Sequence, residues 1–174
     1  MCQACKTCLL FPSKLGWMAV VLVGGKVARL TFGRKTAVAA RAAIGCSKDV
    51  FHRRKHHPLI RRLQAFAQGT PDSFADVVVE LQSLTPFEQQ VLKACRAVSY
   101  GRTISYSALA AAVGRPRAAR AVSNALAKNP IPLIIPCHRV VSSAGRLGRY
   151  SAPGGQAMKR FLLRLEAKNR SRLE

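Results

Sequence analysis

Acidic residues are scarce in this chain. Only 7 Asp and Glu stand against 29 Lys and Arg in 174 residues, so the formal net charge is +22. No acidic residue occurs between Glu88 and Glu166, whereas basic residues recur throughout. Such an excess of positive charge favours a polyanionic partner, and nucleic acid is the simplest one. The alternative is a basic surface that is only solvated, as in a high-salt or acidic habitat.

A long apolar run is also missing. The apolar stretch at residues 17–23 ends at Gly24 and Gly25, which makes it too short for a membrane span or for the core of a secretion signal. We therefore expect no membrane partner. We also expect a reducing compartment, in which the 6 cysteines are free thiols.

A complete set of metal ligands is lacking as well. The N-terminus has a CxxC-like spacing and three histidines lie downstream, the set being Cys2, Cys5, Cys8, His52, His56 and His57. A zinc site is conceivable on these residues, but there is no second well-spaced pair, and the first cysteines lie in a terminus expected to fray. We expect no metal and no cofactor.

Residues 1–83 are predicted to form a small α/β domain. Two β-branched runs around Gly24 and Gly25 predict a β-hairpin over residues 17–32. A helix is expected over residues 58–68 and a further strand over residues 74–81. The predicted domain is thus a small antiparallel sheet with helices, and it carries no clear chemical motif.

Residues 84–174 are predicted to form a second, mainly α domain, which opens with a well-marked helix. Thr85 suits the N-cap, Pro86 the first helical position, and Glu88 completes a capping box. Gly101 is expected to stop this helix. Cys95 lies on its apolar stripe and is therefore interpreted as a core residue.

A helix-turn-helix is expected over residues 105–128. Two short helices flank a break at residues 114–116, in a winged-helix-like arrangement. The second helix opens with basic residues and is otherwise small, so it can approach a DNA groove closely; its candidate DNA contacts are Arg115, Arg117, Arg120 and Ser123. The pattern fits an ordinary helical hairpin with a solvated basic face equally well.

Cys137 and His138 follow a segment with three prolines, in "NPIPLIIPCHRVV". The prolines exclude a regular central strand or helix and favour a turn. A turn would let the imidazole activate the thiol, and Glu166 could fix the histidine tautomer from the final helix. On that amphipathic helix Met158, Phe161, Leu162 and Leu165 are expected on one side. The alternative is a buried structural cysteine.

These motifs resemble the O6-alkylguanine-DNA alkyltransferase family. "PCHRVV" is similar to its active-site signature, and four flanking blocks agree in order and spacing: "YGRTISYSALA", "GRPRAARAV", "G..G.YS" and "GG...K..LL..E". The likeness covers residues 84–166, and the N-terminal half agrees only in outline. The family pairs a variable α/β domain with a helix-turn-helix domain, which agrees with the division above.

The resemblance implies a role for five residues in catalysis. Cys137 would accept the alkyl group from guanine O6 in a single turnover. His138 would act as the base through a water, and Glu166 would orient it. Tyr106 would hydrogen-bond the guanine ring and supply a proton to the leaving base. Asn129 would brace the turn that carries the cysteine.

The resemblance also implies the binding of double-stranded DNA through the minor groove by a monomer. Arg120 would fill the gap left by the flipped base, whose unstacking costs a few kcal/mol. The alkylguanine pocket would be formed by Val140, Tyr150, Ser151 and Arg139. Such a protein would work in the cytoplasm at the nucleoid of a prokaryote, or in the nucleus of a eukaryote. Activity on O4-alkylthymine stays open.

Three other functions compete with this one. A non-catalytic alkyltransferase-like damage sensor would lack a cysteine at the acceptor position, which Cys137 contradicts. A helix-turn-helix regulator would leave Tyr106, His138 and Glu166 without a role. A cysteine hydrolase would account for neither the helix-turn-helix nor the charge. One departure from the family pattern is the extra pair Ala152-Pro153 in "YSAPGG", which affects the loop over the pocket.

Overall fold

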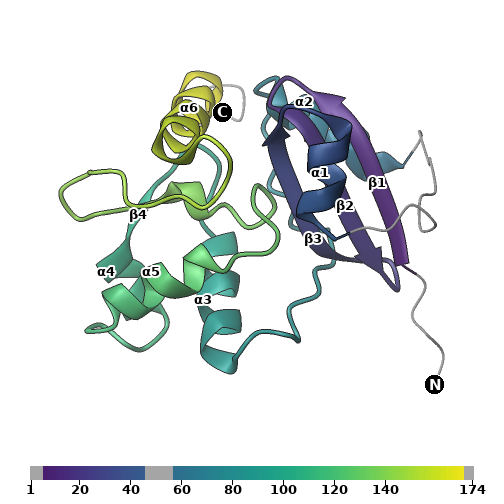
Figure 1. Ribbon diagram of the computed structural model, residues 1–174. Coiled ribbons are helices and arrows are strands. Elements are labelled where there is room, and N and C mark those ends of the chain that lie inside the picture. Colours follow the sequence, from purple (N-terminus) through teal and green to yellow (C-terminus); the bar gives the residue numbers. More distant parts are fainter. Residues whose placement is uncertain (1–5, 46–56, 171–174) are drawn as a thin grey trace. The chain divides into compact units, whose positions relative to one another are not determined.

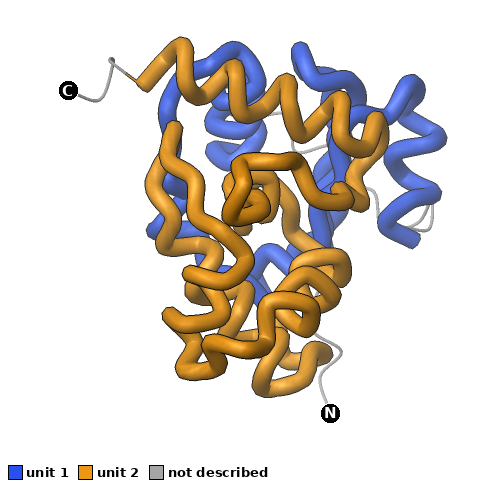
Figure 2. Tube along the Cα trace, turned by 90° about the vertical axis from the view of Figure 1, so that its left-hand side faces the viewer, with its two compact units in different colours: residues 1–80 blue, residues 81–174 orange. Residues whose placement is uncertain are grey.

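The computed structural model describes residues 6–45 and 57–170. The chain divides into two compact units, residues 1–80 and residues 81–174 (Figure 2). The sequence predicted a boundary between residues 83 and 84. Each unit is described by itself below.

The first unit is built on an antiparallel sheet in the order β1-β2-β3. Its strands are β1 (Lys6–Ser13), β2 (Gly16–Val23) and β3 (Lys26–Arg34). The predicted hairpin is confirmed: Gly24 and Gly25 form its turn with φ of 56° and 79°. The first strand was not predicted. Cys8 lies buried in it and is disulfide-bonded, so the expectations of a frayed segment and of free thiols are wrong for this residue.

Helices accompany the sheet in this unit. Helix α1 (Ala37–Ala43) packs on one face, where its Ala40 lies in a cluster with Cys8, Ala19 and Val21 (Figure 1). Alternate strand residues point to the other face. Helix α2 (Pro58–Ala67) contacts β1 and buries Leu59, Ile60, Leu63 and Phe66.

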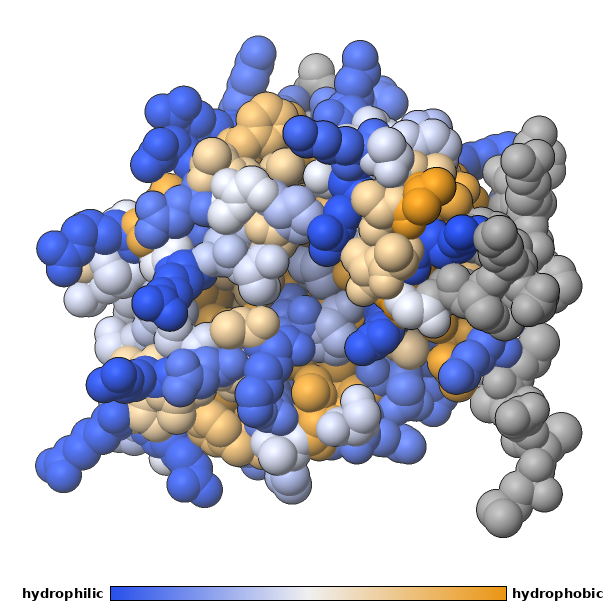
Figure 3. Space-filling model, viewed as in Figure 1, coloured by the Kyte–Doolittle hydropathy of each residue, from blue (hydrophilic) through white to orange (hydrophobic). Residues whose placement is uncertain are grey.

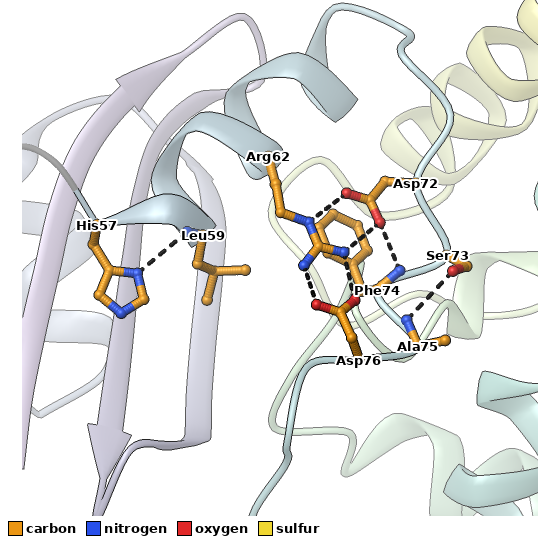
Figure 4. A network of polar contacts seen from close by, with 8 residues as sticks. All are labelled: His57, Leu59, Arg62, Asp72, Ser73, Phe74, Ala75 and Asp76. Atoms are coloured by element: carbon orange, nitrogen blue, oxygen red, sulfur yellow. Dashed lines mark hydrogen bonds and ion pairs between the residues drawn. The ribbon is translucent and has the colours of Figure 1, made fainter.

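The strand predicted over residues 74–81 is wrong. Only Val79 forms a β-bridge, to Val27, and the rest of the segment is irregular. The reason is a polar network that bends the chain (Figure 4). The guanidinium of Arg62 donates to Asp72 at 2.7 Å and to Asp76 at 2.6 Å. Between these carboxylates the buried Phe74 takes φ of 50°, which a regular strand does not allow.

The second unit is mainly helical, as predicted. Its helices are α3 (Pro86–Arg96), α4 (Tyr106–Ala112), α5 (Ala119–Ala127) and α6 (Gly155–Asn169). The short strands β4 (Ile104–Ser105) and β5 (Val140–Val141) pair in parallel. The 3₁₀-helix η2 (Cys137–Arg139) lies directly before β5. Among the described helices none is long and apolar enough to span a membrane.

The capping box on α3 is confirmed, with Thr85 and Glu88 bonded reciprocally. Glu88 also pairs with Lys128, which follows α5, at 2.5 Å. The helix ends at Arg96, earlier than the predicted stop at Gly101. Gly101 instead takes φ of 68° in the turn that leads to β4.

Candidate active site

Cys137 is carried by a tight turn that Asn129 ties together. The Asn129 side-chain amide donates to the carbonyl of Ile135 at 2.8 Å, and its oxygen accepts from the N–H of Ile131 at 3.0 Å. Leu133 is buried with φ of 73°, a left-handed conformation that non-glycine residues rarely adopt. The turn is therefore held in place by side-chain hydrogen bonds and by packing. Cys137 follows it as the first residue of η2.

The Cys137 thiol is free and only 6% exposed. Asn129 Nδ2 lies 3.2 Å from its Sγ. Burial raises the pKa of this thiol above its ordinary value of 9.0, although the Asn129 hydrogen bond and the charge of Lys159 oppose the shift. The thiol is consequently protonated at neutral pH, and its use as a nucleophile requires a base.

His138 is fully buried and bound to Glu166 through one ring nitrogen. Its Nε2 lies 2.7 Å from Glu166 Oε1, and its Nδ1 has no partner among the described residues. An ionised carboxylate only accepts hydrogen bonds, so Nε2 carries the proton and Nδ1 keeps a lone pair. Burial lowers the pKa of His138 below 6.5, against the raising effect of Glu166. The imidazole is therefore a neutral base at physiological pH.

Glu166 is the buried acceptor that α6 supplies. It accepts from the N–H of Gly101 at 3.0 Å and from Arg139 Nε at 2.9 Å, in addition to His138. Burial would raise the pKa of this carboxyl, but hydrogen bonds and charge from His138 and Arg139 lower it to about 2. The carboxylate is thus ionised at any physiological pH.

Arg139 lies in a different environment from the alkylguanine pocket predicted for it. Its guanidinium is buried against Glu166, and Nη1 donates to the carbonyl of Val98 at 2.6 Å. It also lies over the Tyr100 ring, 5.5 Å from the centroid. The side chain can therefore hold the carboxylate in place, and its role in the alkylguanine pocket stays a prediction.

Lys159 is a buried site residue that sequence reasoning missed. Its Nζ donates to the carbonyl of Val140 at 2.6 Å and to the hydroxyl of Tyr106 at 3.4 Å. Lys159, Leu162 and Glu166 form the buried face of α6. The predicted apolar side was therefore misplaced: Leu162 is buried, but Phe161 is 50% exposed. The sequence did carry a signal for Lys159. This residue stands three positions before Leu162 and seven before Glu166, which is the spacing of one helical face.

Tyr106 opens α4 directly after β4, and its phenol is held from three elements. Ser123 of α5 hydrogen-bonds it, and Lys159 of α6 donates to it. Gly148 of the loop after β5 lies so close that a Cβ atom there would overlap the hydroxyl. Burial raises the pKa of the phenol, although the Ser123 hydrogen bond opposes this. Ser123 thus points toward the site, whereas a DNA contact was predicted for it.

Comparisons with known proteins point to one family. The model of the 6-O-methylguanine DNA methyltransferase DNA-binding domain matches residues 86–168. The O6-methylguanine methyltransferase structure of Mycobacterium tuberculosis is 31% identical with a TM-score of 0.78, over 94% of each chain. The chain belongs to the O6-methylguanine-DNA methyltransferase family.

Relatives from distant organisms are also similar to this family member. The methylated-DNA--protein-cysteine methyltransferase of mouse is 55% identical over 78 residues, which are 44% of this chain and 36% of that protein. The protein of that name from Methanosarcina barkeri is 43% identical over 109 residues, 63% of this chain and 66% of that one. The Mycobacterium tuberculosis OGT in complex with DNA gives a TM-score of 0.74 at 31% identity, again over 94% of each chain.

The loop at residues 142–154 of this methyltransferase-family chain carries two predicted pocket residues. The Tyr150 hydroxyl is buried without a partner among the described residues, and burial raises its pKa well above 10.0. Ser151 is exposed. Within the extra pair Ala152-Pro153, the Ala152 carbonyl accepts from the N–H of Gly155 at 3.0 Å. The insertion therefore forms the turn before α6.

The predicted arginines of the helix-turn-helix are all exposed at the start of α5. Arg115 and Arg117 precede the helix, and Arg120 is in its first turn. Arg115 lies over the ring of Phe87 at 5.8 Å. Their exposure leaves these side chains available for contacts outside the chain.

No cluster that could hold a metal ion occurs within residues 6–45 and 57–170. Four residues of the conceivable zinc set lie outside these ranges: Cys2, Cys5, His52 and His56. His57 instead caps α2, where its Nδ1 accepts from the N–H of Leu59 at 3.2 Å.

Proposed function

We propose that this protein repairs DNA directly, by moving the alkyl group of O6-alkylguanine onto its own Cys137. The observation that carries the proposal is the buried His138–Glu166 pair, which lies directly next to Cys137 in the chain. The His138 ring has one nitrogen fixed by the carboxylate and the other without a partner in the described part of the chain. This arrangement provides a base next to a nucleophile whose burial keeps it protonated.

The proton of the thiol passes to His138 Nδ1, through a water, as sulfur attacks the alkyl carbon. The carbon–sulfur bond forms while the carbon–O6 bond breaks, and the electron pair of that bond goes to guanine. Glu166 stabilises the imidazolium that results, because it stays ionised with a pKa of about 2. The product is a thioether that nothing in this site hydrolyses, so each molecule acts once.

Tyr106 assists the departure of guanine by donating its hydroxyl proton to the ring of the leaving base. Lys159 Nζ lies 3.4 Å from that hydroxyl and can hold it in position. Asn129 holds the turn and the sulfur at the same time, with contacts of 2.8 Å and 3.2 Å. The carbonyls of Cys137 and Val140, the N–H of Ser151 and the ring of Tyr150 receive the base.

DNA is bound through α5, and the target base is flipped out of the duplex. A base in the stack cannot reach a thiol that is 6% exposed, so flipping is required, at a cost of a few kcal/mol. Arg120 fills the gap, and Arg115 and Arg117 contact phosphates. The small residues of α5 allow close approach in the minor groove. The protein acts as a monomer where the DNA is, at the nucleoid of a prokaryote or in the nucleus of a eukaryote.

Transfer is tested with a duplex that carries O6-methylguanine labelled in the methyl group. Peptide mass spectrometry is expected to find one methyl group per protein molecule, on the peptide that contains Cys137. Cys137→Ala should bind the duplex and gain no label. Repeated turnover, or label on another residue, would contradict the mechanism. Binding of the damaged duplex without any transfer by the native chain would indicate a non-catalytic sensor instead.

A further inference from the structure

The outer face of α6 carries a row of basic side chains. Arg160, Arg164 and Lys168 are exposed and follow one another at intervals of four residues, and Phe161 beside them is 50% exposed. At about 100° per residue these four side chains fall within an arc of about 100°. Lys159, Leu162 and Glu166 lie on the opposite, buried face. The inner face of α6 therefore contributes residues to the site, and its outer face forms a basic, partly aromatic surface.

The described residues supply no carboxylate that would neutralise the positive charge of this surface. Every acidic residue in the described part of the chain already has a basic partner: Asp72 and Asp76 with Arg62, Glu80 with Lys26, Glu88 with Lys128, and Glu166 with His138 and Arg139. Within that part, no carboxylate pairs with Arg160, Arg164 or Lys168. The row is thus a local excess of three charges, available to an anionic partner.

Helices α6 and α5 lie at separate ends of the second unit. In Figure 1 the yellow helix α6 lies at the top of this unit and α5 in its lower part. Figure 3 shows hydrophilic side chains projecting over α6. A groove contact made by α5 therefore does not account for the α6 row.

We propose that the outer face of α6 binds the phosphate backbone of a second segment of DNA, distinct from the segment held by α5. Guanidinium and ammonium groups in a row suit successive phosphates, and an aromatic ring among them is typical of nucleic-acid surfaces. The inference rests on the proposed function only in taking DNA as the partner. A groove contact by α5 uses only part of the net charge of +22, and a second DNA segment on α6 gives a role to a further part of it.

The salt dependence of DNA binding tests this surface. A triple variant, Arg160→Gln, Arg164→Gln and Lys168→Gln, is compared with a control of equal charge loss in the first unit, Lys6→Gln, Lys14→Gln and Lys35→Gln. The controls are exposed lysines. With a long undamaged duplex, the slope of log K against log[salt] should be smaller by about 2.7 in the α6 variant, at about 0.9 per phosphate lost. A slope equal to that of the native chain, or an equal change in the control, would overturn the proposal.

A bridging assay asks whether two segments bind at once. Protein is bound to an immobilised duplex of about 10 base pairs, one helical turn, and a second fluorescent duplex is added. The native chain and the control should retain the second duplex, and the α6 variant should lose it. Equal retention by all three proteins would overturn the inference. So would an α6 variant that still retains the second duplex but no longer binds anionic lipid vesicles, added in a parallel assay. The α6 variant should transfer a methyl group from a free alkylated guanine base as fast as the native chain. If the native chain itself shows no such transfer, the proposed function is contradicted, while the test of the salt-dependence slope still stands.

Discussion

His138 Nε2 and Glu166 Oε1 lie 2.7 Å apart, and both side chains are buried. The two residues come from η2 and α6, separated by 28 positions in the chain. Their contact fixes which imidazole nitrogen carries the proton, and it leaves Nδ1 as the base. In the proposed mechanism the reactivity of Cys137 therefore depends on this carboxylate, which acts through His138.

Glu166→Gln should slow methyl transfer by about 100-fold or more, because a neutral amide no longer fixes the tautomer or stabilises the imidazolium. It should also cost about 3–5 kcal/mol of stability, since Arg139 is left buried without its counter-charge. Single-turnover transfer and urea unfolding measure the two effects. Glu88→Gln is the matched control, an acid in a more exposed pair with Lys128, and should leave the transfer rate unchanged. Equal rates in native chain and Glu166→Gln would refute the role.

The pH profile of transfer should stay flat through neutrality and fall only below pH 6.5. Burial lowers the pKa of His138 below that value and raises the pKa of Cys137 above 9.0, so the neutral base and the protonated thiol coexist between these values. Transfer rates at saturating duplex, measured from pH 5 to pH 9 (about two units either side of neutrality), give the profile. A midpoint of the acid limb above 6.5 would show that His138 is not held neutral.

The stability of the fold, like the transfer rate, should fall as the pH falls. The folded pKa of His138 is depressed, so the unfolded chain binds the extra proton first, and stability is lost as the pH falls below 6.5. Glu166 adds a second loss of stability as the pH falls from 4.5, its ordinary pKa, to about 2, its pKa in the folded chain. Urea midpoints at a series of pH values measure both, and His138→Gln should remove the loss near 6.5.

Gly148→Ala should displace the Tyr106 hydroxyl, because a Cβ atom at residue 148 would overlap it and would lie 3.0 Å from its ring carbon Cε2. We expect slower transfer with little change in the urea midpoint, since the loop at residues 142–154 is partly exposed. Ser143→Ala, an exposed change in the same loop, serves as the control. Native transfer rates in Gly148→Ala would mean that Tyr106 does not need its present position.

The elements that the sequence predicted well are those whose causes are local. The hairpin at Gly24 and Gly25 and the capping box of Thr85 and Glu88 rest on neighbours within a few residues. The buried Lys159 was missed because its partners are remote: it bonds to Tyr106 across 53 positions.

Errors in unit 1 have the same origin. The valines at residues 77–79 have strand propensity, but the pairs of Arg62 with Asp72 and Asp76 bend the segment that holds them. Propensity cannot register an ion pair that forms across 10 to 14 residues.

Arg62→Lys tests that network directly. Arg62 binds each carboxylate with two nitrogen–oxygen contacts, of 2.7 Å to Asp72 and of 2.6 Å and 2.8 Å to Asp76 (Figure 4). A lysine keeps the charge but loses the planar fork, so the urea midpoint should correspond to a loss of about 1 kcal/mol for this partly exposed group. Hydrogen exchange of the Phe74 amide, which donates to Asp72 at 2.7 Å, should become faster. Methyl transfer should not change, because the residues that are assigned above to the Cys137 site all belong to the second unit. Unaltered exchange at Phe74 would show that the bend does not depend on the fork.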